Sequence, residues 1–118
     1  MPDPASVSVA QHFVGRAPAV RALYDALIVT ARSFGPVLEE PKKTSIHLVH
    51  RTAFAGVATR AAAIVLTIKS ATDIHSPRVS KRQQVSAGRW HVEVRLDDPA
   101  QIDPELAAWL RSAYDISR

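Results

Sequence analysis

The sequence contains no cysteine among its 118 residues. Disulfides, thiolate metal sites and cysteine nucleophiles are therefore excluded, and this absence is compatible with a reducing compartment, so we expect a cytoplasmic protein. No apolar run approaches the roughly 20 residues that a membrane-spanning helix requires. The N-terminal residues also lack a basic segment followed by an apolar stretch. We expect a soluble protein with no secretory signal and no membrane contact.

Acidic residues are scarce in the middle of the chain. Residues 42–95 hold ten Lys or Arg but only two acidic residues, a formal charge of +8, whereas the remainder holds five and nine, a charge of −4. A basic segment attracts nucleic acid, anionic metabolites or acidic proteins, although many domains are basic for solubility alone. Aromatic residues make up only 6% of the chain, and sequence-tolerant binding of single strands usually relies on aromatic stacking. The charge therefore favours an anionic partner bound with little specificity.

A chain of this length forms one domain, and we expect residues 1–118 to be that domain with residues 1–6 frayed. The clearest local pattern is residues 89–96, where Trp90, Val92, Val94 and Leu96 alternate with polar side chains, as in a strand with one buried face. A helix is expected to begin near Pro104, with Asp103 as its cap. Its apolar stripe should pack on the Trp90 face of the strand.

The other elements follow from similar patterns. A Ser8–Gln11 capping box predicts a short helix that ends at Gly15, and apolar residues spaced by three and four predict a helix from Pro18 to Phe34, stopped by Gly35-Pro36. Alternating or β-branched runs predict strands, of which the first is weak, at residues 37–40, 45–51, 63–68 and 79–85. Residues 53–57 either continue the strand 45–51 after a bulge or form its hairpin partner.

Helices at both ends of a block of strands indicate an α+β fold. We predict a mainly antiparallel sheet of four to five strands with the N-terminal and C-terminal helices packed on one face. The residues whose periods agree form the predicted core: Leu23, Leu27, Ile46, Leu48, Ile64, Leu66, Trp90, Val92, Trp109 and Leu110.

Several short motifs, in this order and spacing, resemble a bacterial family of domains of unknown function, numbered 5655. The resemblance covers about residues 7–116 and implies a compact α+β domain with no established activity, so it assigns no catalytic residue. The motifs that carry it are Phe34-Gly35-Pro36, Pro41-Lys42-Lys43-Thr44-Ser45-Ile46, Phe54-Ala55-Gly56-Val57, His75-Ser76-Pro77-Arg78-Val79, Val94-Arg95-Leu96 and the segments Asp103-Pro104-Glu105-Leu106 and Trp109-Leu110-Arg111-Ser112-Ala113-Tyr114.

Motifs that could carry chemistry are few. His47 and His50 would meet on a helix, but a strand sends them to opposite faces, so we expect no metal and no cofactor. Lys42-Lys43-Thr44 is similar to the end of a phosphate-binding loop, yet it lacks the glycines and precedes a strand, which favours a solvated turn. His75 and His91 are the candidates for a histidine-assisted hydrolase, although no partner acid or nucleophile can be grouped with them from spacing.

The period of the strands places five basic or titratable side chains on the sheet face away from the helices: His47, Arg51, Lys69, His91 and Arg95. We therefore predict a binding module for an anionic partner, either nucleic acid, an anionic small ligand or an acidic protein, through a basic sheet face. The alternatives are a structural or oligomerising protein, favoured if Val65 and a strand edge are uncovered, and a small histidine-assisted hydrolase. The sequence leaves monomer and homodimer equally open.

Overall fold

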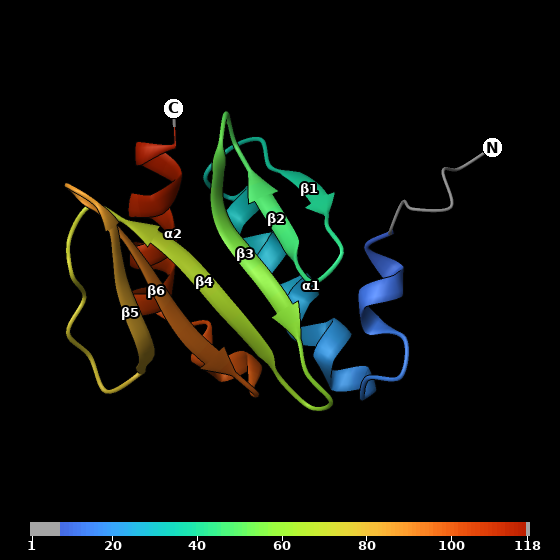
Figure 1. Cartoon of the computed structure of the whole chain (residues 1–118). Coiled ribbons are helices and arrows are strands. Elements are labelled where there is room, and N and C mark those ends of the chain that lie inside the picture. The colour runs from blue at the N-terminus through green and yellow to red at the C-terminus, as the bar shows by residue number, and fades with distance from the viewer. Residues whose placement is uncertain (1–7, 118) are drawn as a thin grey trace.

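The computed structural model describes residues 8–117, and it shows one antiparallel sheet with both α-helices behind it (Figure 1). The sheet has six strands in the order β1-β2-β3-β4-β6-β5. The α+β fold with helices on one face is confirmed, but the sheet has six strands instead of four to five. The strands are β1 (Leu38–Pro41), β2 (Ile46–Val49), β3 (Ala53–Thr59), β4 (Ile64–Ser70), β5 (Val79–Ser86) and β6 (Arg89–Leu96).

The helices are α1 (Pro18–Arg32) and α2 (Pro104–Ile116), with short 3₁₀-helices η1 (Ala10–Phe13) and η2 (Pro99–Gln101). The predicted caps are present. The Gln11 side chain accepts a hydrogen bond from the Ser8 amide, and the Ser8 hydroxyl accepts one from the Gln11 amide. The Asp103 side chain accepts from the Leu106 amide at 3.0 Å. The predicted short helix is a single 3₁₀ segment. The fraying expected for residues 1–6 lies outside the described residues.

Residues 53–59 form a hairpin with β2, which settles the alternative that the sequence left open. β2 ends at Val49, a bulge follows Leu48, and the His50 amide bonds the Thr52 carbonyl across the turn. The prediction that the strand continues to Arg51 is wrong, because Arg51 lies in this turn and its amide bonds the Ser117 carbonyl. Tight reversal of the chain therefore removes Arg51 from the face of the sheet.

The core lies between the sheet and the two helices. Direct partners in the register share a face, so the row Ile46–Val57–Leu66–Val94 runs across four strands toward the helices. Eight of the ten predicted core residues are fully buried: Leu23, Leu27, Ile46, Leu48, Ile64, Leu66, Val92 and Leu110. Trp109 is partly buried and packs against them.

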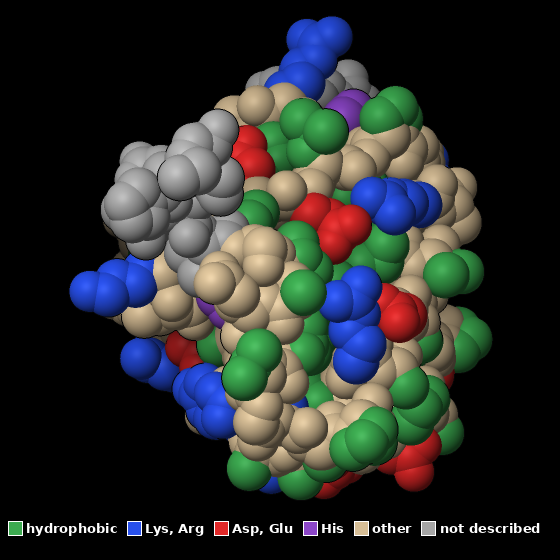
Figure 2. Space-filling model, turned by 90° about the vertical axis from the view of Figure 1, so that its right-hand side faces the viewer, with side chains coloured by type: hydrophobic (Ala, Val, Ile, Leu, Met, Phe, Trp, Pro, Cys, Tyr) green, Lys and Arg blue, Asp and Glu red, His purple; other side chains and the backbone are tan. Residues whose placement is uncertain are grey.

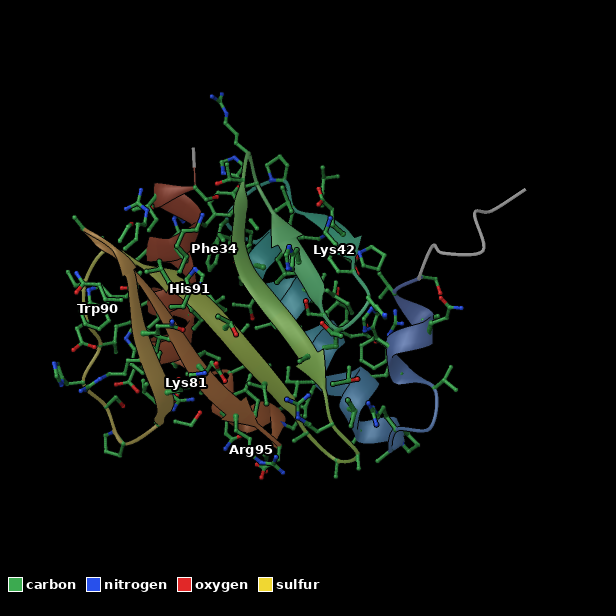
Figure 3. The ribbon with its side chains drawn as sticks, in the orientation of Figure 1. Phe34, Lys42, Lys81, Trp90, His91 and Arg95 are labelled. Atoms are coloured by element: carbon green, nitrogen blue, oxygen red, sulfur yellow. The ribbon has the colours of Figure 1, made fainter. Side chains whose placement is uncertain are left out.

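Trp90 is the misplaced member of the predicted core. It is half-buried beside Ser70 and Gln84 near the start of β6, and Figure 3 shows it at the outer edge of the sheet. The physical reason is that α2 packs mainly over β3 and β4. The apolar face of β6 is therefore buried from Val92 onward but only partly covered at Trp90, near the start of the strand.

Two polar contacts join the N-terminal helix to the first edge strand. Tyr24 donates to Glu39 at 2.6 Å, and Arg32 donates to the other oxygen of the same carboxylate at 3.0 Å. Burial, followed by the hydrogen bond to Glu39, raises the pKa of the Tyr24 phenol well above its ordinary value. The phenol therefore stays protonated and holds β1 against α1.

Candidate functional site

The sheet face away from the helices is open, and it faces the viewer in Figure 3. The register aligns side chains across this face in rows: His47 lies opposite Gly56, Gly56 opposite Thr67, and Thr67 opposite Glu93. The adjacent row pairs Lys69 with His91. The sequence-derived prediction that these residues share one face is therefore confirmed for His47, Lys69 and His91.

A shallow cavity of about 270 Å³ lies over β3 on this open face. It exists because the outward positions of β3 carry Gly56 and Ala58, which leave room between the larger side chains of the neighbouring strands. A Cβ placed at Gly56 would come no closer than 3.8 Å to His47. We call this cavity the β3 trough; its walls include His47, Thr67, Lys69 and His91.

No acidic side chain lines the β3 trough. Burial lowers the pKa of the Lys69 ammonium, and the nearby charge of Arg89 lowers it further. Among residues 8–117, neither Lys69 nor the two histidines of the trough takes part in an ion pair. Lys69 is therefore a basic side chain of the trough that has no ion-pair partner in the described part of the chain.

The acidic residues of the open face pair with other lysines. Glu93 lies 3.9 Å from the Lys81 ammonium, and Glu40 lies 3.4 Å from that of Lys42. The face is thus mixed in charge, and Lys69 is the one Lys or Arg among the residues that line the trough. Basic and acidic side chains are likewise interspersed on the side of the molecule that carries β1 and α1 (Figure 2).

Two of the five predicted binding residues lie outside the trough. Arg51 is in the turn after β2, as described above. Arg95 shares the open face, but it pairs with Val65 toward the other end of the strands, and Figure 3 shows it well separated from His91. Gly56 was missed as a site residue, although a glycine within a strand is a known sign of close approach to the backbone.

The other histidine candidates have structural surroundings. His50 stacks on Tyr114 with ring centroids 4.0 Å apart, away from His47. His75 lies between Asp73 and Arg82, at 3.0 and 2.6 Å, but its side chain is 70% exposed and does not line the β3 trough. His91 meets no acid in the trough.

Within residues 8–117, no group of three or more His, Asp or Glu side chains is arranged to hold a metal ion. No helix within the described residues, including α1 and α2, is long and apolar enough to cross a membrane.

Comparison with known proteins places the chain in a family. A family model described as "Domain of unknown function (DUF5655)" matches residues 9–117. The chain therefore belongs to this family, as the motifs in its sequence indicate. No curated protein and no solved structure is significantly similar to it.

Proposed function

We propose that the protein binds an anionic partner through the β3 trough. A carboxylate or phosphate group would lie over Gly56 and interact with Lys69, His47 and His91. The observation that carries this proposal is that Lys69, His47 and His91 line one cavity whose lining includes no acidic side chain, and none of the three forms an ion pair within residues 8–117.

The lowered pKa of Lys69 supports an anion as the missing partner. Burial and Arg89 both disfavour the charged ammonium, and a bound anion would stabilise it. Binding is therefore linked to protonation of Lys69: the affinity is highest below the lowered pKa and falls as the pH rises through it.

The dimensions of the trough limit what it binds. At about 270 Å³ it is slightly smaller than the roughly 300–1,000 Å³ typical of small-molecule sites. It is open to solvent on one side and offers few aromatic contacts. We therefore expect weak, salt-sensitive recognition of one charged group on a larger partner, with little dependence on its sequence.

The test is a titration of a short labelled single-stranded oligonucleotide and of an oligoglutamate peptide, at about 50 and 200 mM salt, where phosphate-driven affinity changes steeply. Lys69→Gln removes the cation of the trough, whereas Gly56→Leu fills the trough without changing charge. Arg95→Gln is the matched control, because it removes one charge from the same face outside the trough. We expect both trough variants to weaken binding and the control to bind as the wild type does.

Two results would contradict the proposal. One is no binding of either probe at the lower salt concentration. The other is an equal loss in the Lys69 and Arg95 variants together with an unaltered Gly56→Leu variant, which would mean that only the overall charge matters.

Self-association is the second candidate function. Val65 lies half-buried on the open face, and β1 and β5 are sheet edges with no neighbouring strand among the described residues. Leu38 on β1 is 66% exposed. Unpaired edges and apolar side chains of this kind are available for pairing between chains. Sedimentation equilibrium of the wild type and of Leu38→Glu tests this, since a dimer through β1 should dissociate in the variant.

A further inference from the structure

A second cavity, of about 340 Å³, lies where η1, the β1–β2 turn and the end of β3 meet. It shares no lining residue with the β3 trough. Arg16, Lys43 and Arg60 line it together with His12, Thr44 and Thr59, and no acidic side chain does. We call it the η1 cavity. The η1 cavity therefore has three basic side chains in its lining and no carboxylate to balance them.

Chain reversals bring these residues together from separate parts of the sequence. Arg16 follows η1, and the next amide, that of Ala17, bonds the Ala61 carbonyl at 2.9 Å, which ties this segment to the β3–β4 turn. Arg60 lies in that turn. Lys43 lies in the β1–β2 turn, which the Lys42 amide closes on Ser45 at 2.7 Å. The Thr59 hydroxyl of β3 bonds the His12 carbonyl of η1, and Figure 1 shows η1 in blue on the side of the sheet that ends with β1.

Thr59 holds the two guanidinium groups close to each other. Its carbonyl accepts from Arg16 Nη2 at 3.4 Å and from Arg60 Nη1 at 3.1 Å, so the two nitrogen atoms lie no farther apart than the sum of these distances. The Thr59 hydroxyl accepts from Arg16 Nε at 3.1 Å and donates to the His12 carbonyl at 2.6 Å. Arg16 is therefore fixed in place before any ligand arrives, which lowers the entropic cost of binding.

The basic side chains of the η1 cavity have no acidic partner among residues 8–117. Among the described residues, Arg16, Lys43 and Arg60 form no ion pair. In addition, His12 Nε2 is buried without a hydrogen-bond partner in this part of the chain. Two neighbouring guanidinium groups repel each other unless an anion lies near both, and unsatisfied polar atoms are uncommon in folded proteins.

We propose that the η1 cavity is a binding site for a phosphate-bearing ligand. Guanidinium groups present paired donors that match phosphate oxygens, and three cations suit a group that carries two or more negative charges better than a single carboxylate. The site uses Lys43-Thr44, the segment whose sequence is similar to the end of a phosphate-binding loop. Here side chains supply the donors, because the segment is a strand–strand turn without glycine-rich backbone amides to wrap the phosphate.

The test is a ¹⁵N NMR titration of the full chain with sodium pyrophosphate, with inorganic phosphate and a short single-stranded oligonucleotide as parallel arms. The site variants are Lys43→Gln and Arg60→Gln; Arg16 is left intact because it holds η1 on β3. Arg51→Gln is the charge-matched control, since Arg51 lies in the turn at the other end of the β2–β3 hairpin. Lys69→Gln reports separately on the β3 trough.

We expect saturable shifts of the amides of residues 12–17, 43–44 and 59–61. The dissociation constant for pyrophosphate should rise about tenfold in each site variant, the effect of losing about one charge-assisted hydrogen bond, and should stay unchanged in Arg51→Gln and Lys69→Gln. If pyrophosphate shifts these amides and the oligonucleotide does not, the natural ligand is a small molecule that carries phosphate. If both probes shift them, the cavity recognises a phosphate group in either kind of ligand.

Two outcomes would overturn the proposal. Absence of saturable pyrophosphate binding at about 50 mM salt is one, because phosphate contacts are strong at this concentration. The other is binding that Lys69→Gln abolishes and the two site variants retain, which would support the β3 trough and remove the η1 cavity as a site. If Lys69→Gln does not weaken binding of the anionic probes at the β3 trough, only the proposal for the trough is contradicted. The proposal for the η1 cavity depends on Lys43→Gln and Arg60→Gln, so the two proposals can fail independently.

Discussion

Replacement of Gly35 by Ala should destabilise the fold through one identifiable contact. Gly35 follows α1 with φ of +149°, a conformation that L side chains rarely adopt. A Cβ at this position would overlap the Tyr114 hydroxyl and lie 3.3 Å from its Cζ atom. Tyr114 cannot easily withdraw, because it stacks on His50 and packs edge-on against Phe54, and its hydroxyl donates to the Pro36 carbonyl at 3.1 Å.

The expected cost has two parts. Backbone strain of this kind costs about 1–3 kcal/mol. Displacing the Tyr114 hydroxyl from the Pro36 carbonyl adds about 1 kcal/mol for a lost hydrogen bond. Together they predict a decrease of about 2–4 kcal/mol in the free energy of unfolding, a large share of the usual stability of a domain. Urea denaturation measures it directly.

Two companion variants separate strain from overlap. Gly15 has φ of +74°, and a Cβ added there would meet no atom within 4 Å. Gly15→Ala should therefore lower the free energy of unfolding only by the backbone strain, about 1 kcal/mol. In a Tyr114→Phe background the overlap with the hydroxyl disappears, and Gly35→Ala should cost about 1 kcal/mol less than in the wild type. Costs that add within about 0.5 kcal/mol across this double-mutant cycle would refute the proposed contact.

Two further predictions follow from α2. Trp109→Ala should reduce the free energy of unfolding by about 3 kcal/mol, the lower end for a large aromatic side chain, because the ring is only partly buried, with Arg78 5.7 Å from its centroid; an unchanged urea midpoint would show that the ring does not support the core. The Leu106 amide, and then Arg78, lower the pKa of Asp103 below its ordinary 3.8, so Asp103 stabilises the fold above that value and loses its contribution as the pH falls through the lowered pKa. Asp103→Asn should therefore flatten the acid limb of a stability–pH curve, and a limb identical to that of the wild type would contradict this.

Residues 89–96 and 104–116 show what the sequence determined without help from the fold. The alternation of Val92, Val94 and Leu96 assigns their buried face, and Asp103-Pro104 marks where the helix begins, because both signals depend on neighbours within a few residues. The same local logic correctly predicted α1, with its stop near Gly35, and the strand β5.

The candidate sites depended on contacts that no local pattern contains. Lys69 and His91 belong to β4 and β6, and their cavity exists only because the small residues of β3 lie beside them. The position of Arg51 was decided by a turn, and the exposure of Trp90 by where α2 crosses the sheet. Arg16, Lys43 and Arg60 meet through three chain reversals, although the sequence spreads them over 45 residues. Periodicity determines which face a side chain occupies; only the order of the strands and the path of the turns determine which side chains become neighbours.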